Sequence, residues 1–333
     1  ELRNFGVPYI VAEMNTSHFG KIENAKDMIV AAKKSGCNCV KFQSWTTASL
    51  YSKTYYEENP IAKRFVKGFS FSEEQLLELS RFCNEIGISF ASTPYSNQEV
   101  DFLVNECNVP FLKVASMDLN NHKFLDYMGR KGIPLILSTG MGDIFEIREA
   151  IKVIEKTGNK DVCILHCISI YPPEISTIQL NNIIGLRDEF PQYPIGFSDH
   201  SIGIEIPAAA VALGACLIEK HFTLDNSKIG MDNQVATEPG EMKKLVENCH
   251  NVQAALGSYE RIVLPAELEK RKEMRRSLVS TRDLKIGDTI LITDLDLKRP
   301  GTGIPADLLS SIIGKTVKND IAKDILISIE DLE

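Results

Sequence analysis

The chain has 333 residues, of which 44% are hydrophobic, which is enough for one large core or for a large and a small domain. Its net charge of −8 argues against a nucleic-acid-binding protein, because such proteins neutralise phosphates with Lys and Arg. The eight cysteines form no disulfide or zinc pattern, and no stretch is apolar for long enough to span a bilayer, so we expect a cytoplasmic protein without a membrane partner.

Short apolar runs alternate with amphipathic stretches along the first 260 or so residues. The first run, YIVAEM (9–14), precedes IENAKDMIVAAKKSG (22–36), whose apolar residues recur at helical spacing before a terminal glycine. The other strand-like runs are NCVKFQ (38–43), ISFAST (88–93), PFLKVAS (110–116), PLILST (134–139), VCILHCIS (162–169), YPIGFSDH (193–200) and ACLIEKH (215–221). Eight strands separated by helices predict an α/β protein, a (β/α)8 TIM barrel. A doubly wound open sheet is the alternative, but MNTSHFG after the first strand is not its usual Gly-rich turn.

The pattern changes after residue 258. EKRKEMRR (269–276) is a run of mixed charge that is typical of a solvated helical linker. The following residues contain short β-like pieces and turn signals without βα alternation. We therefore expect a barrel over 1–262, a linker over 263–276 and a small β-rich domain over 277–333.

Polar side chains gather where the predicted barrel strands end. Alternation along the strands directs a set of ionisable residues to one end of the barrel interior: Glu13, Lys41, Lys113, His200, Glu219 and His221. Burying an unpaired ion costs several kcal/mol, so such a cluster implies pairing with other charges, a metal or a ligand. Barrel enzymes keep their sites at this end. By the same alternation His166 faces the helices and is predicted to be structural.

The residue types indicate the chemistry. His200 and His221, on neighbouring strands, suit a divalent ion with open coordination positions. Lys41 and Lys113 suit an anionic substrate such as a phosphate or carboxylate, together with a ring of hydroxyl groups on Thr93, Ser116, Ser138 and Ser198. Ser116 and Ser138 do not fit the ideal inward pattern, so we expect a loop or bulge to place them. Glu13 is a candidate general base or water-holding group.

Several motifs appear in an order that resembles the sialic acid synthase family. They are AEMNTSHFG (12–20), VKFQ (40–43), STP (92–94), LKVAS (112–116), LSTGM (137–141), LHCISIYP (165–172), GFSDH (196–200), IEKHFT (218–223) and LKRPGTGI (297–304). Members of that family condense phosphoenolpyruvate with an N-acylated amino sugar to make nonulosonic acids. The similarity covers almost the whole chain, including a C-terminal antifreeze-like (SAF) domain.

The resemblance implies a role for each matching residue. His200 and His221 would hold Mn²⁺ or Mg²⁺, and Glu13 would position or deprotonate the attacking water. Phosphoenolpyruvate would be bound by Thr93, Lys113, Ser116, Ser138 and Ser198, with Lys41 close by and Ser169 where some members have an asparagine. The sugar would contact Gln43, Asp118, Tyr171 and Asp232. Arg299 would reach into the barrel of the neighbouring subunit, which implies a domain-swapped homodimer.

The first motif departs from the family's usual Glu-x-Gly-x-Asn-His-Asn-Gly, because EMNTSHFG keeps only Glu13, His18 and Gly20. The acceptor therefore stays open between N-acetylmannosamine and a diacetamido-trideoxy hexose of the legionaminic or pseudaminic routes. Two other functions are alternatives. A class I aldolase on the same barrel would use Lys113 or Lys220 as a Schiff-base nucleophile. A carbohydrate-binding protein would use the small domain, although it would have no need for the charged barrel mouth.

Overall fold

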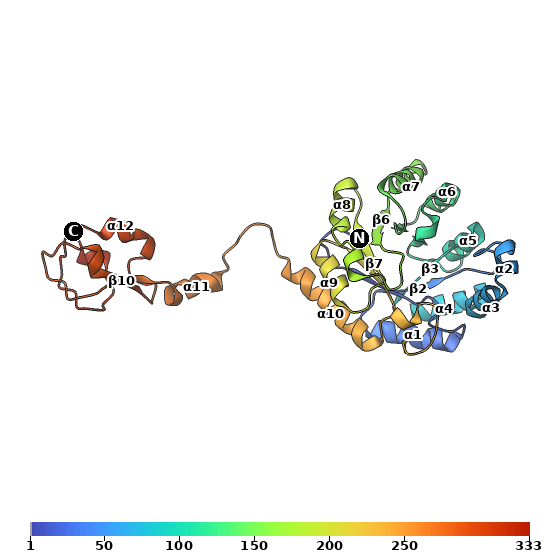
Figure 1. The fold of residues 1–333 in the computed structure, drawn as a ribbon, viewed down its shortest axis with the longest axis horizontal. Coiled ribbons are helices and arrows are strands. Elements are labelled where there is room, and N and C mark those ends of the chain that lie inside the picture. The colour runs from blue at the N-terminus through green and yellow to red at the C-terminus, as the bar shows by residue number, and fades with distance from the viewer. Residues whose placement is uncertain (1) are drawn as a thin grey trace. The chain divides into compact units, whose positions relative to one another are not determined.

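The computed structural model describes residues 2–333, and these divide after Gly257 into two compact units (Figure 1). The first unit is built on eight parallel strands within the described residues: β1 (Tyr9–Glu13), β2 (Cys39–Gln43), β3 (Ser89–Thr93), β4 (Leu112–Val114), β5 (Leu135–Ser138), β6 (Val162–Cys167), β7 (Ile195–Asp199) and β8 (Leu217–His221). Hydrogen-bonded neighbours follow the order β3-β2-β1-β8-β7-β6-β5-β4, and β3 also lies against β4. The ring closes, which confirms the predicted TIM barrel and excludes the open sheet.

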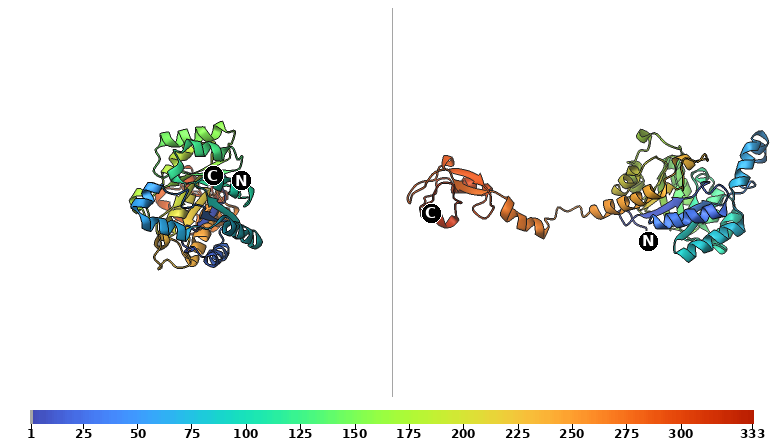
Figure 2. Two further views of the ribbon diagram at one scale, coloured as in Figure 1. Left: turned by 90° about the vertical axis from the view of Figure 1, so that its right-hand side faces the viewer. Right: turned by 90° about the horizontal axis from the view of Figure 1, so that it is seen from below.

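Helices connect successive strands, and most of them cover the outside of the barrel: α1 (Ile22–Lys34), α4 (Glu73–Ile86), α5 (Asn97–Asn105), α6 (His122–Gly129), α7 (Ile144–Lys156), α8 (Asn182–Glu189), α9 (Glu205–Ala212) and α10 (Pro239–Ala255). The connection from β2 to β3 also contains α2 (Lys53–Glu58) and α3 (Pro60–Phe69), which form a separate apolar cluster with Trp45. α1 contacts both α4 and α10 (Figure 2). Local sequence sets the ends of these helices. In α4, for example, Ser72 and Gln75 form a capping box, and Gly87 ends the helix in the left-handed conformation.

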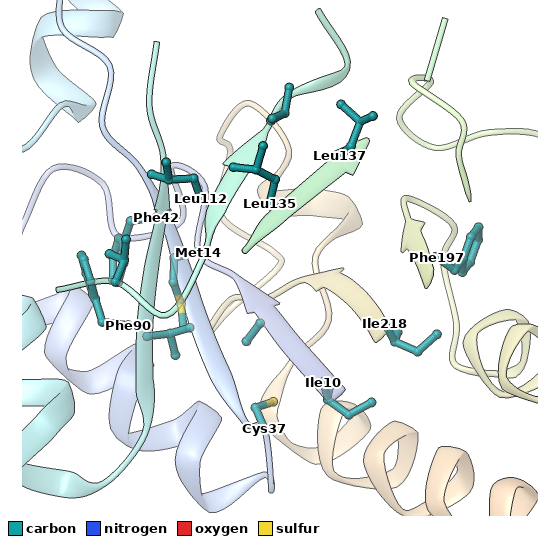
Figure 3. Close-up of a cluster of buried hydrophobic side chains, with 14 of the residues drawn as sticks. Ile10, Met14, Cys37, Phe42, Phe90, Leu112, Leu135, Leu137, Phe197 and Ile218 are labelled. Atoms are coloured by element: carbon teal, nitrogen blue, oxygen red, sulfur yellow. The ribbon is translucent and has the colours of Figure 1, made fainter. Parts of the chain in front are cut away.

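Alternation along each strand separates two apolar layers. The larger layer lies between strands and helices and includes Ile10, Phe42, Phe90, Leu112, Leu135, Leu137, Phe197 and Ile218 (Figure 3). A smaller cluster fills the barrel interior and includes Val11, Cys39, Ala91, Ile136, Cys163 and Leu165. This inner cluster blocks the lower part of the barrel, so polar inward residues are confined to the carboxyl ends of the strands.

The second unit begins at Ser258 and contains α11 (Pro265–Met274), β9 (Ser277–Ser280), β10 (Leu295–Lys298) and α12 (Leu309–Ile312). β9 and β10 pair antiparallel, and isolated bridges such as Val279 with Leu326 extend the β structure. Its own core consists of Leu278, Leu284, Ile290, Ile304, Ile312, Val317, Ile321 and Ile327. The predicted small β-rich domain is therefore present, and the charge run lies largely in α11. Within residues 2–333, no helix combines the length and apolarity needed to cross a membrane.

Candidate active site

A cavity of about 390 Å³ lies at the carboxyl ends of the barrel strands. Of the predicted site residues, all but Asp118 and Arg299 line it: Glu13, Lys41, Gln43, Thr93, Lys113, Ser116, Ser138, Ser169, Tyr171, Ser198, His200, His221 and Asp232. A larger cavity, of about 1050 Å³, opens among residues that precede the strands, such as Pro110 and Pro134. Because TIM barrels hold their catalytic groups at the carboxyl ends, the smaller cavity is the candidate site.

Strand register brings the ionisable groups together. Glu13 on β1 is level with Lys41 on β2 and with His221 on β8, and Ser198 on β7 is level with Glu219 on β8. The inward parity expected for these residues is therefore present. Each of them is less than a tenth exposed.

Two buried lysines share two buried glutamates. The Lys41 ammonium pairs with Glu13 Oε2, lies 3.7 Å from Glu219 Oε2 and donates to Thr93 Oγ1 at 3.1 Å. Lys113 Nζ lies 3.1 Å from Glu219 Oε1, which also accepts a hydrogen bond from Ser198 Oγ at 3.0 Å. The pairing offsets the cost of burying these ions, and the two positive and two negative charges balance.

The two carboxylates differ in proton affinity. Burial raises the pKa of Glu219, but Lys113 and Lys41 outweigh it and lower that pKa to about 2. Burial also raises the pKa of Glu13. The nearby Lys41 ammonium lowers it by less, so the pKa of Glu13 is raised overall. Glu219 therefore stays ionised as a fixed counter-ion, whereas Glu13 is the better proton acceptor of the two.

Hydroxyl groups line the wall beside the lysines. Ser138 is 2% exposed, and its Oγ has no hydrogen-bond partner within residues 2–333. Ser138 lies on the inward face of β5 with Ile136, which corrects the expectation that a bulge would place it. Ser116 does come from a turn after β4 and accepts a hydrogen bond from the Gly140 amide at 3.1 Å.

Gly140 allows two hydroxyls to approach one stretch of backbone. A Cβ atom there would lie 2.2 Å from Ser169 Oγ and 2.8 Å from Ser116 Oγ. A side chain at this position would therefore displace both hydroxyls, so the glycine keeps them close to this backbone.

The two predicted metal-binding histidines lie edge to face, with ring centroids 5.3 Å apart. His200 Nδ1 donates to the Ile168 carbonyl at 2.7 Å, which leaves Nε2 as the nitrogen available to a ligand. Burial holds the pKa of His221 well below its usual value, so this imidazole is neutral. Burial also lowers the pKa of His200, but contact with the Cys167 thiol raises it overall.

This pair of imidazoles suits a divalent ion that is held by few protein ligands. Within residues 2–333, no group of three or more His, Cys, Asp or Glu side chains is arranged to hold a metal. Two imidazoles alone would leave the remaining coordination positions open to water or substrate, which is typical of a catalytic ion rather than a structural one.

Four predicted residues lie outside the cavity. Lys220 faces the helix layer and donates to Asp199 Oδ2 at 2.6 Å, so it is not available as the nucleophile of the aldolase alternative. Asp118 is half-buried and accepts a hydrogen bond from Asn121 Nδ2 at 3.1 Å instead of lining the cavity. Arg299 is exposed in the second unit, after β10. His166 packs between strand and helices against Phe197, as its parity predicted.

Sequence reasoning missed several lining residues, including Asn15, Trp45, Tyr95, Cys167 and Met231. Cys167 shares the inward parity of Cys163 on β6, so the alternation could have found it. The others come from connecting segments after β1, β2, β3 and β8, where no periodic signal indicates which side chains turn inward.

Comparison with known proteins places these features in a family. Residues 28–261 match the NeuB family, and residues 275–333 match the SAF domain. N,N'-diacetyllegionaminic acid synthase of Legionella pneumophila is 38% identical over 98% of this chain and 94% of its own length. Human N-acetylneuraminate-9-phosphate synthase is 35% identical over 95% of this chain and 90% of its own. A crystal structure of N-acetylneuraminic acid synthetase from Leptospira borgpetersenii, at 33% identity, superimposes with a TM-score of 0.74 over 80% of this chain and 90% of that one.

The family matches extend over both units, and they include the strand-end residues from Lys41 to His221. The chain therefore belongs to the NeuB family.

Proposed function

We propose that the cavity condenses phosphoenolpyruvate with an N-acylated hexosamine and releases phosphate, as a nonulosonic acid synthase. The observation that carries the proposal is the pair of buried lysines, Lys41 and Lys113, set among hydroxyl groups beside two imidazoles at the carboxyl end of a barrel. The names of the relatives support this synthase chemistry over the aldolase. The burial of Lys220 outside the cavity also counts against the aldolase.

Phosphoenolpyruvate is bound at the lysine end of the cavity. Lys41 and Lys113 attract its phosphate and carboxylate, and the unpartnered Ser138 hydroxyl supplies a donor that no protein group uses. The other hydroxyl donors of this wall are on Thr93, Ser116, Ser169 and Ser198. These groups stabilise the negative charge of the departing phosphate.

The charge balance of the cavity calls for additional cations. Glu13 and Glu219 already match Lys41 and Lys113, so an incoming phosphoenolpyruvate adds net negative charge to a buried site. A divalent ion at His200 and His221 offsets part of that charge. Arg299 of a neighbouring subunit, which is exposed after β10, offsets more in a domain-swapped homodimer.

The ion, Mn²⁺ or Mg²⁺, would supply Lewis-acid polarisation of the open-chain sugar aldehyde. C3 of phosphoenolpyruvate forms a bond to the aldehyde carbon, and the aldehyde oxygen takes up a proton and becomes a hydroxyl. Water adds to C2 and gives up one proton. The tetrahedral intermediate then breaks its C–O bond to phosphate, and the C2 hydroxyl passes its proton to the leaving phosphate as the ketone forms. Glu13 accepts the proton of that water, because its raised pKa makes it the more basic carboxylate. Gln43 Nε2, which donates to Glu13 Oε1 at 3.0 Å, keeps the carboxylate oriented.

The sugar lies at the outer end of the cavity, near Gln43, Tyr171 and Asp232. The Tyr171 ring lies 4.0 Å from the His200 ring between centroids, so a sugar stacked on Tyr171 would place its aldehyde beside the metal-binding pair.

Phosphate release tests this proposal. Purified protein is mixed with phosphoenolpyruvate, Mn²⁺ or Mg²⁺, and either N-acetylmannosamine or a diacetamido-trideoxy hexose, and the nine-carbon product is identified by mass. Lys113→Ala should raise the apparent constant for phosphoenolpyruvate by roughly ten- to a hundredfold, the value of a charge-assisted hydrogen bond. Lys131→Ala, which alters a lysine paired with Asp101 away from the cavity, serves as the matched control. The proposal would be refuted if the protein released phosphate with none of these sugars.

A further inference from the structure

Two charged side chains interrupt the apolar layer behind the metal-binding histidines. Side chains two positions apart on a strand share a face, so Asp199 lies on the outward face of β7 with Phe197. Lys220 lies on the outward face of β8, between Ile218 and Phe222. Asp199 and Lys220 are each 1% exposed. Apolar side chains are expected at both positions, and departures from such a pattern are typical of functional sites.

The two charged residues form a closed set of contacts with Ser201. Lys220 Nζ donates to Asp199 Oδ2 at 2.6 Å and also to the Ser201 carbonyl. The Ser201 amide and hydroxyl donate in turn to the Asp199 carboxylate, at 2.9 and 3.0 Å. Asp199 and Ser201 flank His200 in the sequence, so one ammonium group on β8 contacts the residues on both sides of this histidine.

The pairing of β7 with β8 ends just before His200. β7 ends at Asp199, which is level with Lys220 on β8. β8 continues to His221, which is level with Glu13 on β1. His221 is therefore held within the sheet, whereas His200 follows the end of its strand. The contacts of Lys220 extend the connection between the two strands past that end.

A hydrogen bond from His200 Nδ1 to the Ile168 carbonyl does not replace this connection. It fixes the rotation of the ring against the segment after β6, but it sets no distance to β8. Two side chains hold one ion well only if the groups behind them keep their separation. The 5.3 Å between the ring centroids of His200 and His221 therefore depends on what joins β7 to β8 at this level.

Stability alone does not require an ion pair here. Buried ion pairs can often be replaced by apolar residues without loss of stability, because removing two charges from water costs about as much as their attraction returns. Apolar contacts are not directional, however, so they would fill the space without fixing the turn at Ser201. The ammonium of Lys220 is directional, because it donates to two oxygens on the segment that carries His200.

We propose that Lys220 and Asp199 are positioning residues for the metal-binding pair, and that their ion pair, closed through Ser201, sets the separation of His200 from His221. The inference rests on the proposed function, in which a divalent ion occupies these two imidazoles. Lys220 and Asp199 lie outside the cavity and act only through the histidines that follow them in the sequence.

The test is the double variant Asp199→Asn/Lys220→Met, which removes both charges together and keeps an acceptor for the Ser201 amide. Its Tm should stay within about 4 °C of the wild type. Mn²⁺ binding, followed by electron paramagnetic resonance, should weaken at least about tenfold. Calorimetric binding of phosphoenolpyruvate without metal should change by less than about twofold, because Ser198 and Glu219 lie within the paired part of β7 and β8.

Asp101→Asn/Lys131→Met is the matched control. It removes a lysine–aspartate pair that lies outside the cavity, so it should leave both binding constants unchanged. Mn²⁺ binding at wild-type strength in the folded Asp199→Asn/Lys220→Met variant would overturn the inference. An equal loss of Mn²⁺ and phosphoenolpyruvate binding would also overturn it, because it would indicate a general loosening of the barrel. If the double variant does not fold, Asp199→Asn alone, which keeps the size of the side chain, decides in the same assays.

These assays use no sugar, so they decide the inference even if the synthase reaction is not observed. If the wild type binds no Mn²⁺, the ion of the proposed function fails, and crystal structures of the wild type and the double variant decide the inference separately. A shift of the His200 ring away from His221 by about 1 Å or more would support it. Superimposable imidazoles would refute it.

Discussion

Replacing Ser138 with alanine should stabilise the free protein and weaken phosphoenolpyruvate binding. The Ser138 hydroxyl is buried and has no hydrogen-bond partner within residues 2–333. An unsatisfied buried polar group costs about 1–3 kcal/mol, so its removal should stabilise the barrel by about 1 kcal/mol once the small lost volume is allowed for. In a unit of this size that corresponds to a rise in Tm of about 2–4 °C.

The effect on the ligand should have the opposite sign. If this hydroxyl donates to the phosphate or carboxylate of phosphoenolpyruvate, its loss removes a hydrogen bond to a charged group, worth about 1.5–3 kcal/mol, and Kd rises roughly ten- to a hundredfold. Thermal unfolding without ligand and calorimetric titration with phosphoenolpyruvate measure the two effects separately.

A second buried serine provides the control. Ser92, on the outward face of β3, pairs with the Ser44 hydroxyl. Ser92→Ala should destabilise the protein by about 1 kcal/mol, because it leaves the Ser44 hydroxyl without its hydrogen-bond partner. It should leave the phosphoenolpyruvate Kd unchanged, because Ser92 lies outside the cavity. The reasoning would be refuted if Ser138→Ala destabilised the protein as much as Ser92→Ala does, or bound phosphoenolpyruvate like the wild type.

Three further predictions concern the histidines and the second unit. His221→Ala, or chelation of the wild type, should nearly abolish phosphate release while the protein stays folded. The control variant His122→Ala, at an exposed histidine, should keep full activity. An active His221→Ala enzyme would remove the metal from the mechanism. Burial lowers the pKa of His18 to about 4 in the folded protein. As the pH falls, His18 is therefore protonated in the unfolded chain before it is protonated in the folded one. The free energy of unfolding should decrease by about 1.4 kcal/mol per pH unit between pH 6.5 and 4. Urea unfolding at several pH values should show a smaller pH dependence of the free energy of unfolding for His18→Gln than for the wild type. An unchanged pH dependence would contradict the assignment of this effect to His18. Mixed dimers of Arg299→Ala and Glu13→Gln subunits should regain activity that neither parent has, and complete inactivity of mixed dimers verified by mass would exclude the swapped arginine.

The sequence by itself determined the barrel and most of the inward side chains. Period-two alternation along each strand assigned Lys41, Glu219 and His221 to the interior and His166 to the helix side, because successive side chains of a strand must point to opposite faces. The parallel βαβ order placed the polar ends of all these strands at one rim. The same alternation was misread at Ser138, which shares the face of Ile136 and needs no bulge.

Only the tertiary structure decided which polar groups meet and which stay unpaired. Lys41 and Lys113 share Glu219 because strands far apart in the chain become neighbours or face one another across the barrel, and no local pattern encodes those distances. Asn15 and Asp232 are separated by 217 positions, yet ring closure brings the segment after β1 beside the segment after β8. Irregular connections carry no periodicity, so their side-chain directions follow from packing against the rest of the molecule, and this packing sets the sugar end of the site.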